Sequence, residues 1–216
     1  MSISLKTDLL TTAMRRESHG TRPEMPRIMN LLRGQTNQLH AQLTRHSLLA
    51  PVLSDPPSRE RYILVLKKLW GWQKAMEREI ESRFDWEKFD YGFETRRKAE
   101  LIEYDLRILG EENSISDIPE CVDLPDLSSP AKILGATYVL EGQTLGAQLL
   151  YSNLNHGLNL DAESGCKFLQ CYGPDPMPKW IEFGQFMDKA SAGLSDDEMV
   201  HSAQQTFNKL NTWFSV

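Results

Sequence analysis

Apolar side chains recur along most of the chain at intervals of three and four residues, a spacing that predicts helices. One helix is expected to begin near Pro26. A longer one is expected from about Ser58 to Arg83, after a break at the prolines of residues 54–60. No segment alternates between apolar and polar residues as a strand does. The apolar positions of the first helix are Ile28, Leu31, Leu32, Leu39 and Leu43.

Capping residues mark further helices. Gly110 suits a left-handed position at the end of a helix over residues 95–109. Ser129 and Pro130 suit the cap and the first position of a helix that is expected to reach about Leu154.

The last third of the chain carries three more helix signals. Asp161 is expected to cap a short helix through Phe168. A second helix is marked by apolar residues at helical spacing, and the last by a capping box from Ser195 to Glu198. The apolar markers are Trp180, Phe183 and Met187, followed by Ala203, Phe207, Leu210 and Phe214.

Together these elements predict an all-α fold, and a length of 216 residues fits a single domain. Residues 1–25 are polar and mixed, and we expect them to form an N-terminal arm or a short lead-in helix. Residues 26–216 are then expected to form one helical domain.

Charge and composition narrow the classes of function. A formal net charge of −6 argues against a surface for nucleic acid or for an anionic membrane. No stretch approaches the roughly 20 apolar residues that span a bilayer, and the first residues do not resemble a secretion signal. Three cysteines without a CxxC pair favour a reduced, cytoplasmic protein.

His40 is the first candidate for chemistry. It lies beside the apolar positions of the first helix, where a histidine is most often structural. His46 follows six residues later and so points elsewhere, which leaves one nitrogen ligand on this helix rather than a zinc or di-iron cluster. A single axial nitrogen is what a haem iron requires, because the porphyrin supplies the other four.

The second candidate is a group of glycines inside the helix that begins at Ser129. Gly135, Gly142 and Gly146 each cost about 1 kcal/mol relative to alanine in a helix interior. Gly142 and Gly146 lie on one face, which Ala147 extends. Either these small residues allow another helix to pack closely, or a flat ligand lies against the backbone, or the helix bends here.

The two candidates occur within longer motifs. "LRGQTNQLHAQL" (32–43) resembles the proximal helix of haem oxygenases, and "GATYVLEGQTLGAQ" (135–148) resembles their glycine-rich distal helix, particularly in the bacterial branch associated with bacteriophytochromes. The likeness continues in order through residues 96–110, 123–135, 168–183 and 203–214. It therefore extends over roughly residues 28–214.

This resemblance implies a site and a reaction. His40 would be the axial metal ligand, and Arg33 would meet a haem propionate. Gly142 and Gly146 would let the backbone crowd the ring, and Tyr138 would line the pocket. The implied activity opens haem b to biliverdin with release of ferrous iron and carbon monoxide. It requires molecular oxygen and an external electron donor such as ferredoxin or a reductase, and a bacteriophytochrome pathway is one destination for the product.

Two positions depart from the family pattern. Gln143 stands where the family often has aspartate or serine, and Ala147 replaces the second of two paired glycines. With Gly142 and Gly146, Gln143 completes the expected catalytic set. These departures leave open a non-catalytic haem carrier or sensor on the same fold. A haem-free relative of the thiaminase or quinone-cofactor type is a third reading, but the sequence shows no clear catalytic cysteine or paired carboxylates.

Overall fold

The computed structural model describes residues 24–216, and within that range it contains helices and no strands. The predicted all-α, single-domain fold is confirmed. The α-helices are α2 (Arg27–Thr44), α3 (Arg59–Arg83), α4 (Ala99–Ile108), α5 (Pro130–Leu158), α6 (Met177–Ala190) and α7 (Asp196–Ser215). The 3-10 helices are η1 (Glu87–Phe89), η2 (Phe93–Arg96), η3 (Glu112–Asp117) and η4 (Phe168–Gln170).

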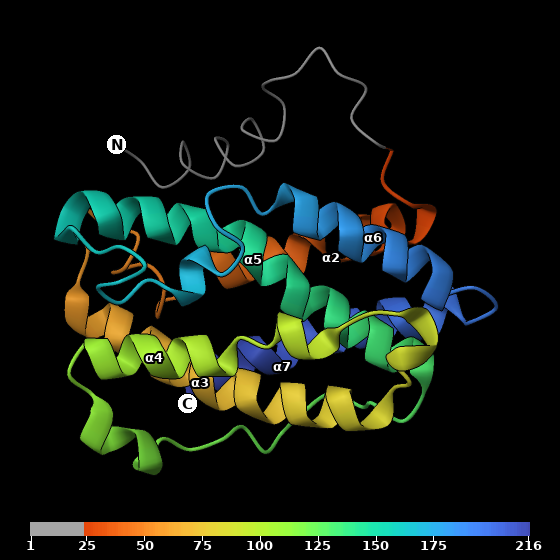
Figure 1. Ribbon diagram of the computed structural model, residues 1–216, viewed down its shortest axis with the longest axis horizontal. Coiled ribbons are helices and arrows are strands. Elements are labelled where there is room, and N and C mark those ends of the chain that lie inside the picture. Colours follow the sequence, from red (N-terminus) through yellow and green to blue (C-terminus); the bar gives the residue numbers. More distant parts are fainter. Residues whose placement is uncertain (1–23) are drawn as a thin grey trace.

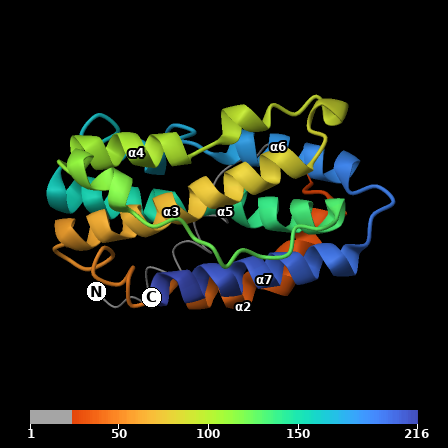
Figure 2. The ribbon, with the colours of Figure 1, turned by 90° about the horizontal axis from the view of Figure 1, so that it is seen from below.

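Helix α7 is the common support for α2 and α5. Both pack along it, and both also touch α6, whereas α2 and α5 make little or no close backbone contact with each other. Figure 2 shows α2 and α7 side by side below α5, with α4 and α6 on the opposite side of the bundle. Helix α3 packs against α4 and α5. The two helices that carry the candidate residues are thus held by shared neighbours.

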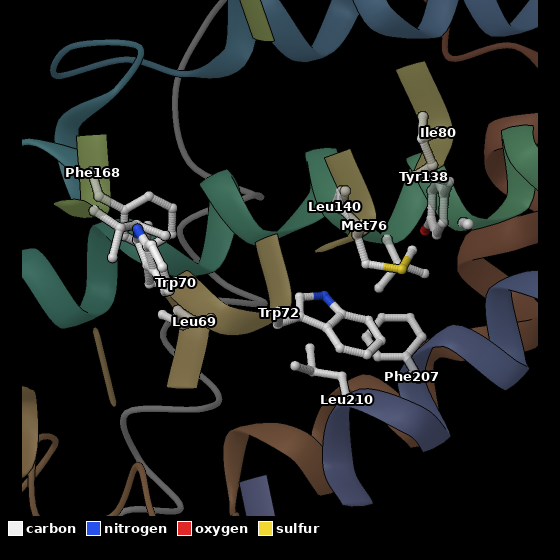
Figure 3. Close-up of a cluster of buried hydrophobic side chains, with 14 of the residues drawn as sticks. Leu69, Trp70, Trp72, Met76, Ile80, Tyr138, Leu140, Phe168, Phe207 and Leu210 are labelled. Atoms are coloured by element: carbon white, nitrogen blue, oxygen red, sulfur yellow. The ribbon is translucent and has the colours of Figure 1, made fainter. Parts of the chain in front are cut away.

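The core forms where α3, α5 and α7 meet. Figure 3 shows Trp72 of α3 beside Phe207 and Leu210 of α7, with Met76 close to Leu140 of α5. Trp72 and Met76 are completely buried. Burying a large apolar side chain stabilises a fold by roughly 1.5–3 kcal/mol, so this cluster anchors α5 on the other two helices.

Several predicted helix ends are confirmed. The hydroxyl of Ser129 accepts a hydrogen bond from the amide of Lys132, and Ser195 accepts one from Glu198. Gly110 follows α4 with φ at +89°, a left-handed conformation that favours glycine. These ends were predictable because each cap lies within three residues of the group that it satisfies.

The helix expected over residues 95–109 begins later than predicted, at Ala99. Its first amides are capped from a distance: the carboxylate of Glu77 on α3 accepts hydrogen bonds from the amides of Lys98 and Ala99 at 2.7 and 3.3 Å. Burial raises the pKa of Glu77 to about 7, although these two hydrogen bonds act in the opposite direction. The 3-10 turn of η2 occupies the positions before this cap.

The short helix expected from Asp161 to Phe168 is absent, and that prediction was wrong. Asp161 does accept hydrogen bonds from the amides of Glu163 and Ser164, but it caps an isolated turn. Gly165 then adopts φ of +122°, which a continuing helix cannot contain. The only helical element nearby is η4.

The arm predicted for residues 1–25 lies almost entirely outside the described residues. Within residues 24–216, no helix combines the length and apolar character that crossing a membrane requires.

Candidate functional site

His40 lies near the C-terminal end of α2 with its ring against α7. The ring meets Phe207 edge to face, with 6.2 Å between the ring centroids. The residue is exposed, and neither ring nitrogen has a hydrogen-bond partner among the described residues. Although the residue as a whole is exposed, desolvation of the ring by neighbouring protein such as Phe207 lowers the pKa of His40 below its usual value. His40 is therefore neutral at neutral pH, the state in which an imidazole binds a metal.

Arg33 and Tyr138 lie close together, although they belong to α2 and α5. Burial raises the pKa of Tyr138, while a hydrogen bond with Thr36 and the charge of Arg33 act in the opposite direction. Tyr138 is buried and packs against Trp180, with 5.7 Å between the ring centroids. Tyr138 thus packs α5 against α6, whereas Arg33 is exposed.

The three glycines of α5 have different surroundings. A Cβ on Gly135 would collide with the carbonyl of Met199 on α7, so this glycine serves close helix packing. A Cβ on Gly142 would meet only Trp180, at 3.9 Å, and one on Gly146 would meet no described atom within 4 Å. Helix packing therefore explains Gly135 but not the other two. Figure 1 shows that the two halves of α5 run in different directions.

Gln143 and Ala147 also differ from each other. The amide nitrogen and oxygen of Gln143 are buried without a hydrogen-bond partner among the described residues. A buried polar group without a partner costs about 1–3 kcal/mol, so this amide is available to a ligand or a water. Ala147 is 4% exposed and belongs to the hydrophobic core. Its methyl group is already covered by protein.

Glu141 lies within an apolar stretch of α5, which requires a partner for its charge if it is buried. It is 2% exposed, and its carboxylate accepts hydrogen bonds from the Lys98 ammonium at 2.9 Å and the Tyr172 hydroxyl at 3.0 Å. Arg96 completes the cluster at 3.5 Å. The burial of Glu141 could be expected from its neighbours, but its partners are 31 to 45 residues away and have no local signal.

The described residues give less support to a metal site built from side chains alone or to a catalytic cysteine. No group of three or more His, Cys, Asp or Glu side chains is placed to hold a metal ion on its own. Burial raises the pKa of Cys166 to about 12 and that of Cys171 to about 11, and it also raises the pKa of Cys121. Thiols with raised pKa values are poor nucleophiles, so none of the three resembles a catalytic cysteine.

Two recesses on the surface are lined by other residues. One, of about 460 Å³, lies beside Arg27 and the segment from Asp188 to Asp197. The other, of about 260 Å³, lies between Leu64 and Trp213. Neither recess is lined by His40, Gly142 or Gly146, so neither is part of the candidate site on α2 and α5.

A family model described as "Heme oxygenase" matches residues 27–216. The chain belongs to the haem oxygenase family. The match includes α2 with His40 and α5 with its glycines, and it extends to the end of α7. No curated protein in the comparison matches the chain.

Solved haem oxygenases share the fold. The NO- and CO-bound enzyme from Neisseria meningitidis has 23% sequence identity and a TM-score of 0.66, with 88% of this chain and 92% of that chain covered. Heme oxygenase-1 from the cyanobacterium Synechocystis, in complex with heme, has 17% identity and a TM-score of 0.67 over 88% and 91%. The haem oxygenase from Leptospira interrogans has 18% identity and a TM-score of 0.67 over 87% and 98%. At these identities the likeness establishes the fold alone.

The residues present on α2 and α5 fit a haem. His40 offers a neutral imidazole nitrogen, Gly146 offers main chain with open space beyond it, and Gln143 offers an unpartnered amide beside Gly142.

Proposed function

We propose that this chain is a haem oxygenase that opens haem b to biliverdin and releases ferrous iron and carbon monoxide. The observation that carries the proposal is the contrast among the glycines of α5. Gly135 is closed against α7, whereas Gly142 and Gly146 are not required by protein packing. Main chain without side chains at an open position suits a flat substrate that must lie close to the helix.

Each candidate residue has a defined part in this proposal. His40 would hold the iron through a neutral ring nitrogen, and the guanidinium of Arg33 would pair with a haem propionate. Gly142 and Gly146 would let the main chain of α5 lie against the bound group and would restrict access to it. Bound haem would supply the iron that activates molecular oxygen, with electrons from an external donor such as ferredoxin or a reductase.

Gln143 contributes hydrogen bonds without acid–base chemistry of its own. Its amide can both donate and accept, so it can hold an ordered water near the reacting face. Unlike a carboxylate, it does not release a proton at neutral pH. Tyr138 and Ala147 would border the site through packing rather than through polar contacts, since both are buried.

A second candidate is a haem-binding protein that carries or senses haem without opening it. The specific observation in its favour is Gln143, which stands where the family often has aspartate or serine. The same residues would bind haem in both cases, so the two candidates differ only in turnover.

The test begins with purified protein and hemin. We expect a Soret band from a one-to-one complex, and then loss of that band with formation of biliverdin and carbon monoxide when a reductant is added in air. A stable haem spectrum under reducing conditions would favour the carrier. Failure to form a complex would contradict both candidates.

His40→Ala tests the ligand assignment. We expect loss of the axial-imidazole spectrum of the complex. His46→Ala is the matched control, because the His46 ring is hydrogen-bonded to Ser215 and to the amide of Leu48 and should leave the spectrum unchanged. An identical spectrum for His40→Ala and the unaltered protein would show that His40 is not the ligand.

The cellular setting is also part of the proposal. All three cysteines are free thiols, which supports a reducing compartment such as the cytoplasm. The motifs around His40 and Gly142 support a place beside a bacteriophytochrome, to which biliverdin would be supplied.

A further inference from the structure

Glu141 directly precedes Gly142 in the chain, and three side chains surround its carboxylate. We call Glu141, together with Arg96, Lys98 and Tyr172, the Glu141 cluster. Its cations come from the segment that precedes α4, and its tyrosine follows η4. A single carboxylate thus connects α5 with two segments that are distant in sequence. None of these contacts involves the open space over Gly146.

Arg96 extends the Glu141 cluster to α6. Its Nη2 donates to a carboxylate oxygen of Glu182 at 2.6 Å, and its Nη1 donates to the carbonyl of Lys179 at 3.3 Å. Lys179 directly precedes Trp180, whose ring carbon lies 3.9 Å from where a Cβ on Gly142 would be. The same guanidinium therefore contacts both the helix that carries Gly142 and the helix that carries Trp180.

Burial raises the energetic cost of leaving any charge of the Glu141 cluster without a partner. Arg96 is 3% exposed and Lys98 is 2% exposed, so both cations depend on protein groups in place of water. A buried charge that loses its partner is strongly unfavourable. Sliding α5 relative to its neighbours would separate the charges, so the cluster restrains this turn of α5 more narrowly than apolar packing does.

We propose that Glu141 is a positioning residue that fixes the main chain of α5 at Gly142 relative to Trp180. In doing so, it sets how closely that main chain approaches a bound haem. Its part toward haem rests on the proposed function, but the restraint on α5 is present without haem and is measurable there. Glu141 acts through Gly142 and does not itself contact the substrate.

Amide hydrogen exchange of the haem-free protein tests the restraint. Glu141→Gln removes the charge at nearly constant size. We expect the rise in exchange rate at residues 138–147 to exceed the rise in the other helices by a factor on the order of ten. Tyr172→Phe removes one hydrogen bond, keeps both ion pairs, and serves if the first variant does not fold. It should produce a smaller increase in the same residues.

The matched control is Asp105→Asn. Asp105 is equally buried, and its carboxylate accepts hydrogen bonds from the amides of Lys167 and Phe168 at 2.7 and 2.8 Å. We expect faster exchange near residues 166–170 and an unchanged exchange rate at residues 138–147. Unchanged exchange at 138–147 in the Glu141 and Tyr172 variants would overturn the proposal, and so would an equal rise in every helix.

The hemin complexes test the consequence for haem. We expect Tyr172→Phe to change the absorption spectrum of the ferric complex and the ratio of biliverdin isomers, while Asp105→Asn changes neither. If the unaltered protein does not bind hemin, the proposed function fails and the exchange result still decides the restraint. If it binds and opens haem, but both cluster variants keep its spectrum and isomer ratio, the positioning of haem by Glu141 is refuted.

Discussion

Both halves of α5 contain glycine within a helical sequence, but the first half is buried and the second half is largely uncovered. Every residue from 133 to 141 is buried, and Gly135 is closed against the backbone of α7. From 142 to 153, only Thr144 and Ala147 are buried, and Gly146 faces open space. Glycine therefore has two structural roles in one helix. In the first half it admits another helix, and in the second half it leaves main chain uncovered.

The largest expected effect contrasts Glu141 with Gln143, two polar residues on either side of Gly142. Glu141→Gln leaves two buried cations short of a partner, and we expect a loss of about 3–5 kcal/mol in the free energy of unfolding. Gln143→Leu removes an amide that has no partner, so the haem-free protein should keep or slightly gain stability. Urea denaturation of both variants measures the difference, and similar losses would contradict the contrast.

The second prediction compares two glycines. Gly135→Ala introduces a methyl group that collides with the carbonyl of Met199, and we expect a loss of about 1–3 kcal/mol. Gly146→Ala has room for its methyl group and should gain up to about 1 kcal/mol from higher helix propensity. Thermal unfolding of the haem-free variants distinguishes the two. Equal effects would mean that both halves of α5 are packed alike.

The third prediction fills the open space directly. Gly146→Leu should fold normally, because no described atom lies within 4 Å of the new Cβ. The longer side chain would occupy the position proposed for the haem ring, so hemin affinity should fall at least about tenfold, or about 1.4 kcal/mol. A hemin titration followed at the Soret band measures this. Unchanged affinity would place the ligand elsewhere.

The smallest expected effect concerns pH. The pKa of His40 is lowered by desolvation, so the ring stays neutral somewhat below pH 6.5. The unfolded chain binds a proton more readily than the folded one, so stability from this group is present above pH 6.5 and is lost as pH falls through the lowered pKa. Hemin ligation should weaken over the same range. His40→Ala should remove this contribution to the pH dependence of unfolding, and an unchanged profile would contradict it.

Local sequence predicted the features whose physical cause is local. Ser129, Ser195 and Gly110 satisfy groups within a few residues of themselves, and each marks a helix end in the structure. Asp161 gave a misleading signal, because a carboxylate caps a turn as readily as a helix. The positive φ of Gly165, which ends that turn, has no unique sequence marker.

The features that were missed depend on residues far apart in the chain. The start of α4 is set by Glu77, which lies nearly two turns before the end of α3. Spacing placed Gly142 and Gly146 on one face, but only the folded arrangement of α5, α6 and α7 distinguishes them from Gly135. The sequence indicated that Glu141 needs a partner if it is buried, but it did not identify Arg96, Lys98 and Tyr172 as those partners.

Because α2 and α5 both rest on α7 rather than on each other, α7 acts as a spacer between them. The side chains of α7 determine how far apart it holds α2 and α5. One of them is Phe207, which contacts the His40 ring. Changes in α7 would therefore alter how α2 and α5 lie relative to each other, without altering a residue on either.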